Sequence, residues 1–202
     1  TTVTPTKRIK LTFPRGMSLK PNRKVCRDNK LNENSALGNP KQVVNSCRGA
    51  VIGTGTAMIY LNRNKAAPLR DAVLVAFNAG KTRKGQAKIK IYGYSQSTTV
   101  GILMSSVLKG RVLNLHIPVL SYDSSVGTFK LGIPGARLKR PELGINVKGK
   151  NKRYVRASCP RSPLVTRAVF AMGTRDASTG KPTSKTTNVR SKKSTQKCRA
   201  RR

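Results

Sequence analysis

The Gly-Lys-Thr triplet at residues 80–82 follows an apolar run at residues 73–77, as in a strand that enters a phosphate-binding loop. A loop of that kind has the pattern Gly-x4-Gly-Lys-Ser/Thr, and its first glycine would fall where this chain has Val75. A helix should also follow the loop, because its N-terminal amides hold the phosphate. Residues 88–92 alternate between polar and apolar instead, which predicts a strand. We therefore expect the triplet to form a turn between two strands.

Acid–base chemistry has few candidate residues. The six carboxylates are scattered and include no close pair: Asp28, Glu33, Asp71, Asp123, Glu142 and Asp176. We expect each to form a local ion pair with one of the many Lys and Arg residues. A Ser–His–Asp relay would have to use His116, the only histidine, with Ser121 and Asp123, and no Gly-x-Ser-x-Gly turn supports it. Distant carboxylates leave a glycosidase open, but we predict a non-enzymatic chain with no catalytic residues and no cofactor.

The four cysteines are Cys26, Cys47, Cys159 and Cys198, and they form no Cys-x-x-Cys pair. With one histidine in the chain, this spacing argues against a metal site. Buried thiols or two disulfides remain, and the Lys and Arg residues beside the cysteines favour disulfides. Of the three connectivities, we favour Cys26–Cys47 and Cys159–Cys198, each contributing roughly 3–4 kcal/mol. Disulfides indicate an oxidising compartment, and a start at Thr1 is typical of a processed chain, so we expect a secreted or cell-surface protein.

The charge is strongly unbalanced, with 42 Lys and Arg residues against 6 Asp and Glu residues, a net of +36. Residues 72–122 contain no acidic residue at all. Few of the cations can be paired within the chain, so we expect anionic partners such as nucleic acid, acidic lipid headgroups or envelope polymers. No apolar run reaches the roughly 18 residues that a membrane-spanning helix needs.

Polyanion binding would fall to the cations of the turn after residue 80 and of the C-terminal end. The candidates are Lys81, Arg83, Lys84, Lys88, Lys90, Lys192, Lys193, Lys197, Arg199, Arg201 and Arg202. Tyr92 and Tyr94 lie beside two of them and are the best candidates for stacking on bases. The cations are spread along the whole chain, which favours attraction without sequence readout.

Strand patterns recur along the chain, and no window of eleven residues or more shows a helical stripe. The predicted strands cover residues 8–13, 51–61, 71–78, 88–92, 100–108, 113–119, 129–133, 152–157 and 165–172, with residues 186–190 as a final edge strand. About ten short strands separated by Gly and Pro turns predict an all-β fold, a two-sheet antiparallel β-sandwich with two disulfides, with a barrel as the alternative.

Two domain-level features complete this interpretation. We assign residues 1–176 to the β-sandwich domain and residues 177–202 to a basic C-terminal segment tethered through Cys198. Residues 28–44 are polar and form the one long connection, which a Cys26–Cys47 bridge would close at its base.

Several short motifs resemble those of a group of uncharacterised secreted actinobacterial proteins. The group has an opening of the form LTFPxG…C…C…VGxGxA, and this chain is similar to it at residues 8–16, 25–26, 45–47 and 51–57, then at 75–80, 91–94, 119–120, 156–160 and 198. The resemblance implies an exported, disulfide-linked β-sandwich with no assigned activity. This chain is far more basic than the group.

Two functions follow from these expectations. The first is an extracellular structural or assembly subunit, in which residues 1–13 or the C-terminal segment would add to the sheet edge of a neighbouring copy. The alternative is a protein that binds nucleic acid or an anionic envelope polymer without sequence specificity.

Overall fold

The computed structural model describes residues 2–21, 24–118, 123–149, 154–158 and 162–197, and within them the chain is built mainly of strands. The strands are β1 (Thr6–Thr12), β2 (Met17–Leu19), β3 (Val51–Tyr60), β4 (Pro68–Lys81), β5 (Ala87–Ser95), β6 (Val100–Lys109), β7 (Val112–His116), β8 (Ser125–Gly132), β9 (Leu138–Arg140), β10 (Ile145–Val147), β11 (Val155–Ala157), β12 (Leu164–Met172), β13 (Thr187–Arg190) and β14 (Ser194–Gln196). The helical pieces are α1 (Pro40–Ser46) and the 3₁₀ turns η1 (Arg48–Ala50), η2 (Leu61–Arg63) and η4 (Pro141–Leu143). The predicted all-β class is confirmed.

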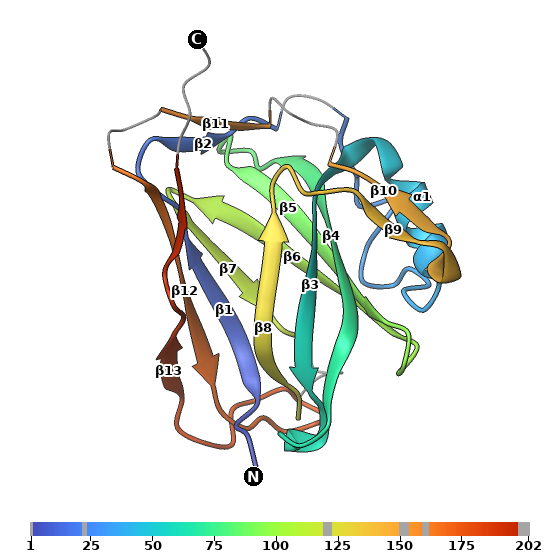
Figure 1. Cartoon of the computed structure of the whole chain (residues 1–202), viewed down its shortest axis with the longest axis vertical. Helices are drawn as coiled ribbons and strands as arrows, with labels where there is room; N and C mark the ends of the chain where they lie inside the picture. Colours follow the sequence, from blue (N-terminus) through green and yellow to red (C-terminus); the bar gives the residue numbers. More distant parts are fainter. Residues whose placement is uncertain (1, 22–23, 119–122, 150–153, 159–161, 198–202) are drawn as a thin grey trace.

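One antiparallel sheet dominates the fold and curls round on itself (Figure 1). Its strands follow the order β13-β12-β1-β7-β6-β5-β4-β3-β8, and β14 pairs with β12 as the tenth strand. The run from β3 to β7 is a meander of hairpins, the connection expected for antiparallel strands joined by short turns. Two further pairs, β9 with β10 and β2 with β11, lie outside this sheet.

The curled sheet has two halves, one formed by β3, β4, β5, β6 and β8 and the other by β1, β7, β12 and β13. The halves meet along a crease between β6 and β7. These strands pair at Leu108–Leu113 and Lys109–Val112, next to their hairpin turn. Across the curl, the Thr6 amide of β1 donates to the Ser124 carbonyl, and the Val126 amide of β8 donates to Thr6 Oγ1. A single continuous sheet therefore stands where the sequence predicted two separate ones, because the β6–β7 hairpin keeps the two halves hydrogen-bonded at one corner.

The inner face of the curled sheet holds one apolar core. Alternate residues of strands from both halves meet there, including Ile9, Leu115, Leu74 and Ile91, all 3% exposed or less. This is the period-two pattern that the sequence predicts for half-buried strands.

The outer face of β4 and β5 carries a second core that the sequence pattern did not indicate. Residues 24–50 and the β9–β10 hairpin lie over this face (Figure 1). They contribute apolar side chains from α1 and β10 to the second core. Helix α1 begins after Asn39, whose side chain accepts from the Gln42 amide, and has Pro40 in its first turn. The Cys26–Cys47 disulfide closes this segment and confirms that predicted pair. The predicted Cys159–Cys198 pair lies outside the described residues.

The first strand, β1, and the last two strands, β13 and β14, all pair with β12. β1 lies between β7 and β12, so both of its edges are hydrogen-bonded. That arrangement corrects the expectation that residues 1–13 could add to the sheet of another copy. The predicted final strand is confirmed as β13, which pairs with β12 at the edge of the sheet.

Candidate anion-binding site

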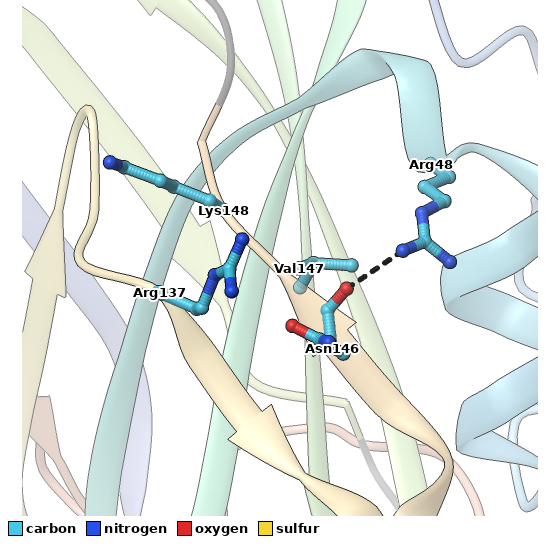
Figure 2. Close-up of a pocket in the computed structure, with 5 residues that line it drawn as sticks. All are labelled: Arg48, Arg137, Asn146, Val147 and Lys148. Carbon is cyan, nitrogen blue, oxygen red and sulfur yellow. Dashed lines mark hydrogen bonds between the residues drawn. The ribbon is translucent and has the colours of Figure 1, made fainter.

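A small pocket lies where η1 meets the β9–β10 hairpin (Figure 2). Its volume is about 130 Å³, and it is lined by Arg48, Arg137, Asn146, Val147 and Lys148. Three of the five residues are cationic, and none is a carboxylate. None of the three cations was among the residues that the sequence singled out.

The β9–β10 hairpin positions two of these cations. Leu138 pairs with Val147 as the last residue pair of the hairpin, and Arg137 and Lys148 are the next residues outward on the two chains. Side chains alternate between the faces of a strand, and Val147 is buried in the outer core. Arg137 and Lys148 flank this pair and are both exposed, as two positive charges at the adjacent ends of the two strands.

The hairpin is anchored well enough to keep these positions fixed. Leu143, Ile145 and Val147 are buried against the outer core, and Gly144 makes the tight turn with a φ of 64°. On the other side of Arg137, the Ala136 carbonyl accepts a hydrogen bond from Thr54 Oγ1 of β3. The backbone on either side of the pocket is thus tied to the main sheet.

The third cation comes from the disulfide-closed segment. Arg48 follows Cys47 directly and begins η1. Its guanidinium donates to the Asn146 carbonyl at 3.0 Å (Figure 2). It also donates to Asn45 Oδ1 at 3.4 Å. These two bonds hold the Arg48 side chain beside the hairpin.

The residues predicted to bind polyanions do not form one site. Lys81, Arg83 and Lys84 are exposed on the β4–β5 hairpin, and Lys192, Lys193 and Lys197 are exposed around β14. Lys88 is partly buried and pairs with Asp28 at 3.4 Å. Arg199, Arg201 and Arg202 lie outside the described residues. In the sheet order, four strands separate β13 from β5, so the hairpin and the C-terminal cations occupy different parts of the sheet.

Lys90 does not belong to this exposed set. Its side chain is 2% exposed, and its Nζ donates to the Leu31 carbonyl at 2.6 Å and the Cys26 carbonyl at 3.2 Å. The Asp28 carboxylate lies 2.7 Å from the same nitrogen. The prediction was wrong for Lys90 because residues 24–50 cover the face that the alternation assigned to solvent.

The same covering segment buries the two tyrosines that were candidates for stacking. Tyr92 is 0% exposed and Tyr94 is 6% exposed, and the Tyr92 hydroxyl donates to the Leu37 carbonyl at 2.6 Å. Burial raises the Tyr92 pKa. Both rings belong to the outer core and are not available to bases.

The carboxylates have two kinds of partner. Asp28 pairs with Lys88 and Lys90, and Glu142 pairs with Arg140, as expected. Asp71 instead accepts from Ser95 and Ser97, and Asp176 accepts from the amides and hydroxyls of Ser178 and Thr179. Those four hydrogen bonds, the strongest from the Ser178 hydroxyl, lower the Asp176 pKa to about 2. The prediction of ion pairs throughout was wrong for these two residues.

The remaining sites for chemistry are sparse in the part of the chain that the structure describes. His116 is exposed at the end of β7, Asp123 is partly buried, and Ser121 lies outside the described residues. No cluster of three or more His, Cys, Asp or Glu side chains suited to a metal occurs among the described residues. None of the helices in the described ranges is long and apolar enough to span a membrane.

The Gly-Lys-Thr triplet forms part of a β-hairpin, as predicted. Lys81 ends β4, β5 begins at Ala87, and the Thr82 amide donates to the Gln86 carbonyl between them. Gly85 has a φ of 75°, which a tight turn requires. No helix follows the triplet, so it lacks the amides of a phosphate loop.

Comparison with known proteins finds no matching family model, no matching curated protein and no matching solved structure. The resemblance to secreted actinobacterial proteins stays a prediction.

Proposed function

We propose that this protein binds anionic polymers without sequence specificity through its exposed Lys and Arg residues. The proposal rests on the excess of cationic side chains over the carboxylates that could pair with them. The 42 Lys and Arg residues of the chain face 6 carboxylates, and the three ion pairs among the described residues use two of those, Asp28 and Glu142.

The placement of the cations favours a polymer over a single small ligand. Exposed Lys and Arg occur on the β4–β5 hairpin, around β14 and beside the β9–β10 hairpin, on separate parts of the fold. A flexible chain of negative charges can contact several such places at once and release counterions from each. Burial of Tyr92 and Tyr94 removes the two aromatic side chains that the sequence offered for stacking on bases.

The proposal is tested by the salt dependence of binding. The full chain is titrated with a fluorescent single-stranded oligonucleotide, a duplex and inorganic polyphosphate between 50 and 200 mM salt. If six or more anionic groups are contacted, affinity for the nucleic acids should fall by at least about 10³-fold over this range. Two oligonucleotides of equal length and different sequence should bind alike. Affinity that is insensitive to salt, or absent in all three titrations, would overturn the proposal.

A second candidate function, assembly of copies through strand addition, is favoured by the edge strand β13. All four of its residues are exposed, Val189 is 50% exposed, and its pairing partner in the sheet is β12. Unpaired strand edges recruit further strands. Arg190 and the net charge of +36 oppose contact between copies. Assembly by this route should therefore increase at high salt, measured as mass by analytical ultracentrifugation, whereas polymer binding should weaken.

The place of action is part of the proposal. The Cys26–Cys47 disulfide supports action in an oxidising environment, as a secreted or cell-surface protein. The polymer would then be an anionic envelope polymer or extracellular nucleic acid. We also propose that Cys159 and Cys198 form a second disulfide and that the protein has no catalytic role.

A further inference from the structure

We propose that the pocket formed by Arg48, Arg137 and Lys148 binds a single phosphate group of the anionic polymer. This inference rests on the proposed polymer binding and names the group that is held and the residues that hold it. The rest of the cationic surface would attract the polymer without fixing it.

The size of the pocket points to a small anion. Its volume of about 130 Å³ is below the roughly 300–1,000 Å³ of pockets that enclose drug-sized ligands. One tetrahedral oxyanion suits a pocket of this size. The pocket can therefore hold a backbone phosphate while the attached groups stay outside.

The three positive charges of the pocket repel one another, and a bound anion would remove this repulsion. Arg137 and Lys148 lie just beyond the last residue pair of the hairpin, Leu138 with Val147, so two like charges extend from the adjacent ends of its strands and repel one another. Arg48 adds a third charge from a separate segment, 3.0 Å from the Asn146 carbonyl. The lining contains no carboxylate to neutralise the three. An oxyanion between them would turn this repulsion into charge-assisted hydrogen bonds.

Arginine also gives the pocket a preference for phosphate. A guanidinium presents five N–H donors in a planar fork that matches the oxygens of phosphate. Arg48 uses one donor on the Asn146 carbonyl and one on Asn45, which fixes its orientation and leaves further N–H donors on the same group. The hydrogen bond from Thr54 Oγ1 to the Ala136 carbonyl fixes the backbone just before Arg137. Preorganised donors lose less freedom on binding, so the site gains affinity.

The test measures the pocket separately from the polymer. The double variant Arg137→Gln/Lys148→Gln removes two pocket charges, and the matched control Lys192→Gln/Lys193→Gln removes two exposed charges around β14. Inorganic phosphate is titrated into each full-length chain in phosphate-free buffer, and amide shifts are followed by NMR. The pocket variant should bind phosphate at least about tenfold more weakly, and the control should match the wild type. Equal weakening in both, or shifts that avoid residues 146–148, would overturn the inference.

A conservative variant and a stability check guard against misfolding. Arg48→Lys keeps the charge and loses the planar fork, so its phosphate affinity should fall between those of the wild type and the double variant. The urea midpoints of Arg48→Lys and of the control should agree with that of the wild type, and the double pocket variant should be at least as stable because it removes a like-charge repulsion. A loss of phosphate binding that is matched by a loss of folding in every pocket variant would count against the site.

Titration with an oligonucleotide distinguishes this inference from the proposed function. A short oligonucleotide should displace phosphate from the wild-type pocket, since both use the same oxyanion contact. If the oligonucleotide binds with steep salt dependence and leaves the pocket shifts unchanged, the inference is wrong and polymer binding stands. If phosphate binds at the pocket and no polymer binds anywhere, the proposed function is wrong and the pocket serves free phosphate. Displacement by a sulfated polymer but not by a phosphodiester would overturn the assignment to phosphate.

Discussion

The Nζ of Lys90 lies 2.7 Å from Oδ1 of Asp28, and this contact joins the middle of the main sheet to the segment that covers it. The same ammonium group donates to the carbonyls of Leu31 and Cys26. A buried Lys is tolerated when each of its donors finds an oxygen. In this protein one lysine thereby fixes the start of residues 24–50 over β5.

Replacing this lysine should destabilise the fold. Lys90→Met fills a similar volume but leaves the Leu31 and Cys26 carbonyls without their donor, which should cost about 2 kcal/mol. Lys88→Met is the matched control, because Lys88 is its neighbour on β5 and its side chain is one-third exposed. The control should change the free energy of unfolding by less than about 0.5 kcal/mol. Urea denaturation gives both values, and equal losses would contradict the structural role of Lys90.

The same contact makes stability depend on pH in the acidic range. The hydrogen bond from Lys90, followed by the charges of Lys90 and Lys88, holds the Asp28 pKa below its ordinary value of 3.8. A carboxyl whose pKa is lower in the folded state stabilises the fold above its unfolded pKa, and this contribution is lost as pH falls through the folded pKa. Wild type should therefore be more stable than Asp28→Asn at pH 6, and the difference should shrink below about pH 4. A difference that stays constant down to pH 2.5 would contradict this linkage.

The Cys26–Cys47 disulfide should stabilise both the outer core and the pocket. The bridge spans a sequence separation of 21 residues, and removing it in Cys26→Ala/Cys47→Ala should cost about 3 kcal/mol. Arg48 follows Cys47, so phosphate affinity should also fall in this variant. Thermal unfolding and the phosphate titration measure the two effects. Unchanged phosphate binding would show that the pocket keeps its geometry without the bridge.

Gly101 allows a close approach between β6 and the covering segment. A Cβ at this position would overlap the Leu37 carbonyl, so Gly101→Ala should destabilise the fold by about 1–3 kcal/mol. Gly93 on β5 is the matched control, because its added Cβ would meet Ile102 and Leu74 at 3.4 Å, an ordinary contact distance. Chemical denaturation of the two alanine variants should separate them clearly. Similar stability would mean that the covering segment can move away at little cost.

Much of the main sheet follows from local pattern. Residues 8–13 alternate apolar and polar side chains, residues 165–172 are mainly apolar, and both form strands close to the predicted bounds, β1 and β12. The hairpin after Lys81 was predicted from its turn residues and because the first glycine of a phosphate loop is missing. These features depend on residues near one another in the chain, which is why the sequence was sufficient for them.

The outer layer depends on distant contacts and was missed for that reason. Helix α1 has seven residues, which is shorter than the window in which a helical stripe can be recognised. β9 and β10 have three residues each and are held by packing on the outer core. The pattern around Lys90 indicates one buried face, and nothing in it shows that a second segment will cover the other.

The pocket could not be predicted for a related reason. Arg48, Arg137 and Lys148 come from separate parts of the chain, and each looks like an ordinary exposed cation in a sequence that has 42. What distinguishes them is the hairpin register and the position of η1, which only the tertiary structure supplies. A search for the densest charge runs leads instead to the β4–β5 hairpin and the C-terminal segment.

The crease between β6 and β7 has a consequence for how the protein responds to cold. Two residue pairs at the hairpin and the Thr6 contacts link the halves by hydrogen bonds, while apolar packing across the inner core supplies most of their attraction. Hydrophobic attraction weakens on cooling, whereas backbone hydrogen bonds depend on temperature much less. Near freezing, the halves should therefore loosen along this line while the strand ladders within each half stay intact.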